Sequence, residues 1–483
     1  MAGIGIRLNK IFNKNSIAAK LFGFGYSMMI SIAPMIIIIT VVVLMQILLG
    51  YSKLGYATRE LYSCTVLYIF IFALMAASPF TAVISRYMSD VIYEEKYDDI
   101  PPCFYMGLVL NLILAVIPGV AFCVHEYRVG EVPIWYVFMG FAGYISLLIT
   151  FYIMLYLSIC KDYKKISAFY IIGMMVTLIL SLFLHYVFGV RTDVAMLASL
   201  DVGMFLIAVM EYAQFKQYFK ENSGNYAGVI SYLGRYWQLV VANFLYICGL
   251  YCHNFVFWTT DQHLIVVKSF VCMQPYDMAT CIAMFTNISS SIIFLSRIEM
   301  NFHERYKQYS EAVIGGRGVD IDRAKNRMFR QLMEEVMSLV RIQFIVTVAV
   351  FLLAMVLLPR FGFGGKVMII YPCLAAGYFI MFIMYALIIF MYYFNDLTGA
   401  VQTSLSFFVS TVIFSFMATK LPMAWYGIGL VIGAFVGFSV AYYRLRYMEK
   451  HLDIHIFCNG FVMKPGEGRK PSNRVYNSRS KKE

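Results

Sequence analysis

The most informative ionisable side chain in this sequence is Asp201, which lies in the middle of an apolar run. Its neighbours are Ala198, Ser199 and Leu200 on one side and Val202 on the other. If this run crosses a membrane, an ionised carboxylate at its centre costs about 2.5–3.5 kcal/mol on insertion scales. We therefore expect Asp201 to face a cavity or a partner, as a proton or substrate site. The alternative is a shallower or neutral carboxyl group that only makes a structural hydrogen bond.

Four side-chain amides also fall inside apolar runs, at Asn111, Asn243, Asn287 and Gln402. Such amides hold neighbouring membrane helices together, at roughly 0.6–2 kcal/mol each. If they line a cavity instead, they can hydrogen-bond the hydroxyl groups of a sugar.

Tyrosine and phenylalanine are abundant, with 37 Tyr and 41 Phe against only 4 Trp. Most are explained by the aromatic belts at membrane interfaces. Tyr246 and Tyr251 lie within a run, however, and aromatic faces next to hydroxyl groups suit a glycan. The hypothetical lining of a substrate path is therefore Asp201, Asn243, Asn287, Tyr246 and Tyr251.

A charged set recurs where two of the apolar runs end. Arg86 and Asp90 follow one run, and Arg297 and Glu299 follow another. Opposite charges at this spacing can pair within or between helices. We interpret the four residues as a hypothetical cytoplasmic gate that closes when two parts of the protein meet. Ordinary anchoring at the membrane surface is the alternative.

Motifs for catalysis and cofactors are missing from the sequence. It contains no G-x-x-x-x-G-K-[ST], no H-E-x-x-H and no G-x-S-x-G, so neither a P-loop nor these hydrolase sites are predicted. The ten cysteines form no C-x-x-C pair, which favours small apolar packing residues over metal ligands or a disulfide framework. We predict a protein that is not an enzyme, with no cofactor and no metal. Its driving force must come from an ion gradient, a partner or polymer synthesis.

The elements that position these residues are membrane helices. Of 483 residues, 61% are hydrophobic and 14% charged, whereas a soluble domain carries roughly 25% charged residues. A spanning helix needs about 20 mostly apolar residues. The predicted fold is an all-α polytopic membrane protein with about twelve transmembrane helices. Its spans are predicted at 25–49, 61–84, 103–124, 133–158, 166–189, 194–213, 233–256, 277–297, 337–358, 367–390, 399–419 and 424–445.

Lysine and arginine are divided unequally between the two sides of these spans. One side, which includes both termini and residues 298–336, carries 31 of them, and the other side carries 8. The positive-inside rule therefore places both termini in the cytoplasm. The net charge of +12 is explained by this pattern, which argues against a nucleic-acid binder.

Similar residues recur six spans apart, which indicates two parallel six-helix halves, a common transporter design. Ser85-Arg86-Tyr87 corresponds to Ser296-Arg297-Ile298, and Lys161-Asp162 corresponds to Asn395-Asp396. The predicted organisation is a cytoplasmic segment 1–24, a first half 25–213, a linker 214–232, a second half 233–445 with a cytoplasmic insert 298–336, and a basic cytoplasmic tail 446–483.

Several motifs resemble the Pel exopolysaccharide transporter family (PelG). They run in order through the chain: residues 1–8 (MAGIGIRL), 31–34 (SIAP), 85–98, 161–164 (KDYK), 277–280 (DMAT), 297–306, 315–316, 393–400 and 425–429 (WYGIG). The resemblance extends from residue 1 to about residue 458 and leaves out the basic tail. Ile6 and Ala33 depart from the family pattern, where Phe and Gly are expected.

This resemblance implies a fold similar to the multidrug/oligosaccharidyl-lipid/polysaccharide flippases, with two bundles and alternating access. It implies export of a polysaccharide rich in N-acetylhexosamine and partly cationic, across a bacterial cytoplasmic membrane. It also implies partners, namely a cytoplasmic glycosyltransferase and membrane subunits that include a cyclic-di-GMP sensor. Two alternatives remain open: a flippase for lipid-linked oligosaccharides or small molecules, and a membrane scaffold for a polysaccharide synthase.

The topology can be tested with single cysteines in a cysteine-free background. We expect Lys325→Cys to react with a membrane-impermeant maleimide only after the cells are permeabilised, because the charge bias places residues 298–336 inside. Labelling of residue 325 in intact cells would contradict the topology.

Overall fold

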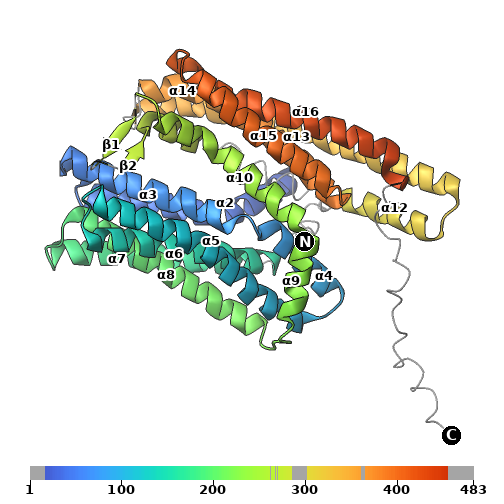
Figure 1. Cartoon of the computed structure of the whole chain (residues 1–483), viewed down its shortest axis with the longest axis horizontal. Coiled ribbons are helices and arrows are strands. Elements are labelled where there is room, and N and C mark those ends of the chain that lie inside the picture. Colours follow the sequence, from blue (N-terminus) through green and yellow to red (C-terminus); the bar gives the residue numbers. More distant parts are fainter. Residues whose placement is uncertain are drawn as a thin grey trace, which may run out of the picture.

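The computed structural model describes residues 17–454, apart from positions 161, 262, 267, 269, 285–301 and 361–364. It is an elongated bundle of helices with one short β-hairpin (Figure 1). Asn287, Arg297 and Glu299, three of the residues predicted to form the path and the gate, lie outside the described residues.

The first half contains seven α-helices: α2 (Ile17–Leu48), α3 (Tyr56–Ala77), α4 (Thr81–Tyr93), α5 (Ile100–Arg128), α6 (Ile134–Ile159), α7 (Tyr163–Tyr186) and α8 (Thr192–Tyr218). The second half follows with α9 (Tyr226–Arg235), α10 (Trp237–Trp258), strands β1 (Leu264–Val266) and β2 (Phe270–Cys272), α12 (His303–Gly315), α13 (Gly318–Arg360), α14 (Lys366–Tyr393), α15 (Leu397–Ala418) and α16 (Ile428–Ile454). Residues 274–284 are also helical.

Ten of the described helical segments are long and apolar enough to cross a membrane, and the apolar part of α2, Ala33–Leu48, is shorter. Each of the predicted spans coincides with a helix, except that most of the span predicted at 277–297 lies outside the described residues. The predicted all-α membrane fold is confirmed.

Three predicted boundaries change in the structure. The span predicted at 61–84 is two helices, because α3 ends at Ala77 and α4 begins at Thr81. Pro79 lies between them, and its missing N–H and fixed φ disfavour a continuous helix. The span predicted at 337–358 is the second part of one 43-residue helix, α13, which begins at Gly318 within the predicted insert. The span at 233–256 begins later, because Tyr236 separates α9 from α10.

The two halves repeat the same packing. In the first half α2 packs on α7, and α8 packs on both α6 and α7; in the second half α10 packs on α15, and α16 packs on both α14 and α15. Figure 1 shows the two bundles side by side, with the β-hairpin near one end and α12 at the opposite end. We call these two ends the hairpin end and the insert end.

The repeat extends to a polar contact at the turn before the fifth helix of each half. Asp396 caps α15 by accepting from the Gly399 N–H, and it pairs with Arg444 of α16 at 2.7 and 3.0 Å. In the first half Asp162 accepts from Tyr218 of α8 and pairs with Lys165 at 3.1 Å. Burial alone would raise the pKa of Asp162, but these hydrogen bonds outweigh it and hold the pKa below its ordinary value.

Helices α7 and α8 approach each other closely through two glycines. A Cβ atom at Gly203 would lie 1.7 Å from Thr177 Oγ1 and 2.9 Å from the backbone oxygen of Gly173. Small residues of this kind let membrane helices pack backbone to backbone. The position of Asp201, two residues earlier on α8, depends on this contact.

We expect Gly203→Ala to lower the melting temperature of the detergent-solubilised protein. Overpacking costs about 1–3 kcal/mol, and the backbone of Gly173 leaves no flexible group to move aside. Gly234→Ala on α9 is the matched control, since no atom lies within 4 Å of a Cβ there. Equal melting temperatures for Gly203→Ala and wild type would contradict this packing.

Candidate functional site

The two halves meet at the insert end through Arg86 of α4. Its guanidinium donates to Asn395 Oδ1 at 2.8 Å and lies 4.1 Å from the centre of the Tyr236 ring. Asn395 forms the turn between α14 and α15 with a left-handed φ of 58°, a conformation that Asn tolerates better than most residues. Arg86 therefore joins the first half to two separate parts of the second.

Asp90, one turn after Arg86, makes the neighbouring contact. Its Oδ2 accepts a hydrogen bond from the Tyr232 hydroxyl of α9 at 2.5 Å. Of the four hypothetical gate residues, Arg86 and Asp90 are thus described, and both contact the second half. Their partners here are tyrosines and an asparagine. The gating role itself stays a prediction.

Asn243 of α10 lies at the break between α3 and α4. Its amide nitrogen donates to the carbonyl oxygen of Ser78 and to Thr81 Oγ1, the latter at 2.8 Å. The Ser78 carbonyl also accepts from the N–H and the hydroxyl of Thr81 within the first half. Asn243 adds a hydrogen bond from the other half, so its contacts belong to the interface between the halves.

At the hairpin end the interface is aromatic. Tyr68 of α3 stacks on Trp258 of α10 with ring centres 4.9 Å apart. Its hydroxyl donates to the carbonyl oxygen of Val271 in β2 at 2.6 Å and accepts from the Val271 N–H at 3.3 Å. The edge of the hairpin is therefore paired with a side chain of the first half.

A cavity of about 310 Å³ lies beside this contact, between α3, α5 and α6 and against β2. Seven of its sixteen lining residues are aromatic: Tyr68, Phe72, Phe122, Tyr136, Phe141, Tyr144 and Phe270. One acid also lines it: Glu126 of α5 is 1% exposed and lies 3.3 Å from His125 Nδ1. We call this space the aromatic cavity. Rings with a carboxylate at the edge can bind the apolar faces and the polar or cationic groups of a sugar.

Asp201 lies inside the first half, where α8 meets α6 and α3. A Cβ atom at Gly143 of α6 would lie 2.2 Å from Asp201 Oδ1 and 3.3 Å from Ile69 of α3. A side chain at residue 143 would therefore force the Asp201 carboxylate to move. Asp201 Oδ1 is buried and has no hydrogen-bond partner among the described residues.

The surroundings of Asp201 connect it to the aromatic cavity. Tyr62 and Tyr136 lie close enough to interact electrostatically with its carboxylate, and the Tyr62 hydroxyl is buried without a described partner. Ile69 and Tyr136 also line the cavity. Asp201 is therefore directly behind the cavity wall. The structure does not bring it together with Asn243, which binds Ser78 and Thr81.

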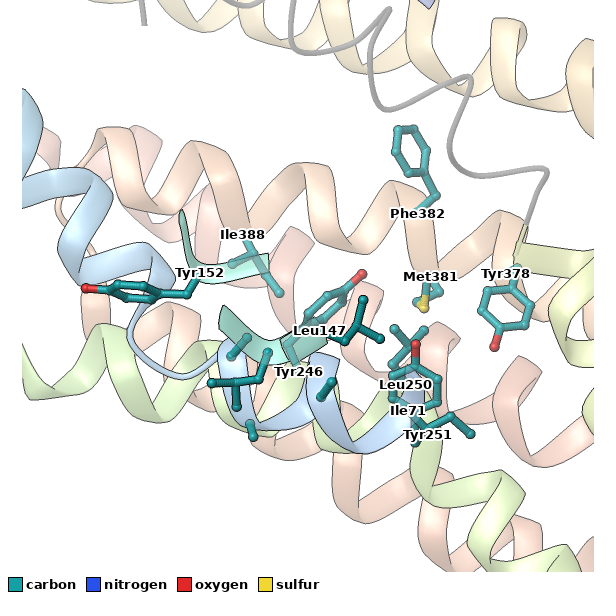
Figure 2. Close-up of a cluster of buried hydrophobic side chains, with 14 of the residues drawn as sticks. Ile71, Leu147, Tyr152, Tyr246, Leu250, Tyr251, Tyr378, Met381, Phe382 and Ile388 are labelled. Carbon is teal, nitrogen blue, oxygen red and sulfur yellow. The ribbon is translucent and has the colours of Figure 1, made fainter. Parts of the chain in front are cut away.

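Tyr246 and Tyr251 pack within a buried cluster (Figure 2). Tyr246 stacks on Tyr385 with ring centres 4.6 Å apart, and Tyr251 is 6% exposed. The Tyr246 ring is also 6.2 Å from the Phe407 ring of α15, centre to centre, and Figure 2 shows Ile71 of α3 beside Tyr251. Their part in a substrate path stays a prediction, as does that of Asn287.

The remaining two amides differ in environment. Asn111 is buried and donates to the carbonyl oxygen of Gly107 in its own helix at 3.0 Å. Gln402 is exposed on α15. Neither contacts the aromatic cavity in the described structure.

Glu211 is a buried acid that the sequence did not single out. It is fully buried on α8, and neither carboxylate oxygen has a hydrogen-bond partner among the described residues. Tyr170 of α7 is close enough to interact with it electrostatically. The sequence did place this acid inside a membrane span, since Glu211 falls within the span predicted at 194–213. It lay near the end of that span, where an acid is ordinarily assumed to reach water.

The arrangement defines a membrane transporter built from two six-helix bundles. Similar solved structures support this fold. An outward-facing multidrug resistance MATE family transporter of the MOP superfamily matches with a TM-score of 0.61 and 15% identity, covering 89% of this chain and 96% of the other. A MATE structure in the bent conformation has a TM-score of 0.58 and 13% identity, covering 94% and 99%. An inward-facing MATE structure has a TM-score of 0.54 and 13% identity, covering 82% and 91%.

The chain belongs to the PelG family. The family model described as "PelG: Putative exopolysaccharide Exporter (EPS-E)" matches residues 1–457. Among curated proteins none matches this chain. The family resemblance read from the sequence is confirmed, and the fold is similar to that of MATE transporters of the MOP superfamily, as the resemblance implied.

We expect Arg86→Ala to reduce the polymer released by the cell roughly tenfold, with the protein still inserted at normal abundance. The substitution removes a charge-assisted hydrogen bond and a cation–π contact, and a tenfold change corresponds to ~1.4 kcal/mol. Lys96→Ala is the matched control, because Lys96 pairs with Glu94 on the same side of the interface at 2.6 Å. Normal export by both Arg86→Ala and Arg297→Ala would refute the gate.

Proposed function

We propose that this protein exports a Pel-type exopolysaccharide, rich in N-acetylhexosamine, from the cytoplasm to the outside along a path between its two helical bundles. The observation that carries the proposal is the match of an exopolysaccharide exporter model to residues 1–457. The two-bundle fold supports it. In this proposal both termini and the insert end are cytoplasmic, and the hairpin end faces outward from the bacterial inner membrane.

A polymer with many hydroxyl groups needs a polar or aromatic route, because stripping those groups into lipid is costly. Such groups lie at the interface between the halves and in the aromatic cavity beside it, which the second half lines through Phe270. Arg86, Asp90 and Asn243 lie toward the insert end, and the aromatic cavity with Glu126 lies at the hairpin end. The proposed path follows this interface.

Negative charge near the route suits a partly cationic glycan, because a low-dielectric surrounding strengthens the attraction. Glu126 lines the aromatic cavity, and Asp201 lies one layer behind it. We assign Asp201 an indirect role, in which its carboxylate sets the electrostatic environment of the cavity through Tyr136. Proton binding at the same group remains a second role consistent with its burial.

The proposed partners fit the two ends of the molecule. A cytoplasmic glycosyltransferase would deliver the growing chain at the insert end, where α12 and the first turns of α13 form a charged helical pair. Membrane subunits, including a cyclic-di-GMP sensor, would contact the lipid-facing helices. A flippase for lipid-linked oligosaccharides and a synthase scaffold are the alternatives.

The test is complementation of a strain that lacks this gene but keeps the polysaccharide synthase. We expect the wild-type gene to restore hexosamine polymer in the medium. Asp201→Asn keeps the shape and removes the charge, so it should lower the exported polymer several-fold without an equal loss of protein. Glu221→Gln is the matched control, since Glu221 is exposed in the segment between the halves and lies outside the proposed path and the insert.

The outcomes separate the alternatives. Polymer trapped inside the deletion strain supports export, whereas loss of all polymer synthesis supports a scaffold. Accumulation of a lipid-linked oligosaccharide supports the flippase. Wild-type export by Asp201→Asn would reduce that residue to a structural role.

A further inference from the structure

Two cysteines from different halves of the protein meet at the hairpin end. The Sγ atoms of Cys64 on α3 and Cys272 on β2 are 2.8 Å apart. Both side chains are 2% exposed, and 208 residues separate them in the sequence. Two other buried cysteines have different surroundings, since Cys103 contacts the Tyr156 hydroxyl and Cys252 contacts a backbone carbonyl.

The contact between Cys64 and Cys272 is positioned by neighbouring contacts between α3 and the chain that follows β1. Gln274 lies 3.5 Å from Glu60, Cys272 from β2 meets Cys64, and Val271 is bound at both backbone atoms by Tyr68. Glu60, Cys64 and Tyr68 follow one another at successive turns on one face of the helix. The chain from Val271 to Gln274 therefore runs along α3 in a fixed register.

A further contact holds the tip of the hairpin on the first half. Lys268 forms an ion pair with Glu131, which lies in the turn between α5 and α6. The hairpin itself is a regular antiparallel pair in which Cys272 is opposite Leu264. The position of the Cys272 thiol is thus determined from both sides.

We propose that Cys64 and Cys272 form a disulfide that links the hairpin of the second half to α3 of the first. An S–S bond is about 2.05 Å long, so the two sulfurs need to approach by less than about 1 Å. The proposed topology places the hairpin outside the cytoplasm, where disulfides persist. The apolar surroundings that made both cysteines look like packing residues also protect the bond once it has formed.

The reaction is a thiol–disulfide exchange with a disulfide-bonded oxidoreductase of the extracytoplasmic space. One thiolate attacks the disulfide of the oxidoreductase and forms a mixed disulfide, releasing the first thiol of that protein. The second thiolate then attacks the mixed disulfide, which forms the Cys64–Cys272 bond and releases the second thiol. Two protons and two electrons pass from the cysteine pair to the oxidoreductase. The exchange takes place before the hairpin docks, because docking buries both thiols.

The test uses the full chain with a specific protease site inserted between Glu221 and Asn222, in the exposed segment between the halves. Two samples are prepared. In the first, cells are lysed in denaturant with N-ethylmaleimide, which blocks free thiols and prevents exchange. In the second, the protein is purified in its folded state and cleaved with the protease. We expect most of the cleaved chain to migrate as one band without reductant and as two fragments with reductant. Peptide mapping should identify the linked Cys64 and Cys272 peptides in both samples.

Single substitutions assign the bond. Cys64→Ser and Cys272→Ser should each give two fragments without reductant, whereas Cys103→Ser should behave as wild type. Two fragments from the wild-type chain, both as isolated and after treatment with 4,4′-dipyridyl disulfide, would overturn the proposal. This readout does not depend on export, so its failure leaves the proposed function untouched.

Discussion

Inside a bilayer every backbone N–H and C=O must find its partner within the protein, and this requirement governs the rest of the structure. It explains why the described spans are continuous helices. The exception is the break at Pro79, which separates α3 from α4. There the carbonyl oxygen of Ser78 accepts from the Thr81 N–H of its own half and from Asn243 of the opposite half. The break in the helix is thus the place of a specific contact between the two bundles.

The interface between the halves uses different chemistry at its two ends. At the insert end, exposed charged and amide groups make single contacts that can exchange with water, as Arg86 does with Asn395. At the hairpin end, stacked rings and doubly bound backbone groups make a dense, buried contact around Tyr68. The first kind is easily broken and remade. The second resembles a permanent core, and the two ends are therefore expected to differ in mobility.

The sequence was sufficient for the fold because hydrophobic length is a strong signal. It located the described helices, and it indicated the repeat that the paired packing of the two halves shows. The predicted spans 61–84 and 233–256 were wrong in being continuous, because the helices are interrupted at Pro79 and at Tyr236. The candidate site was harder to predict from the sequence than the fold. An acid such as Asp201 is conspicuous in an apolar run, but only the packing against Gly143 shows which side of the helix it occupies. Similarly, no spacing rule relates Cys64 to Cys272, because their contact depends on how two distant segments fold together.

Helix α13 is uninterrupted over 43 residues, so at about 1.5 Å per residue it is a rod of roughly 65 Å. Near its exposed end Phe329 stacks on Phe394 with ring centres 5.3 Å apart, and the next residue, Asn395, receives the hydrogen bond from Arg86. Because Phe394 directly precedes Asn395, a tilt of α13 that displaced Phe329 would act on the turn that Arg86 binds. The length of the helix thus offers a mechanical link from the insert to the contact between the two bundles.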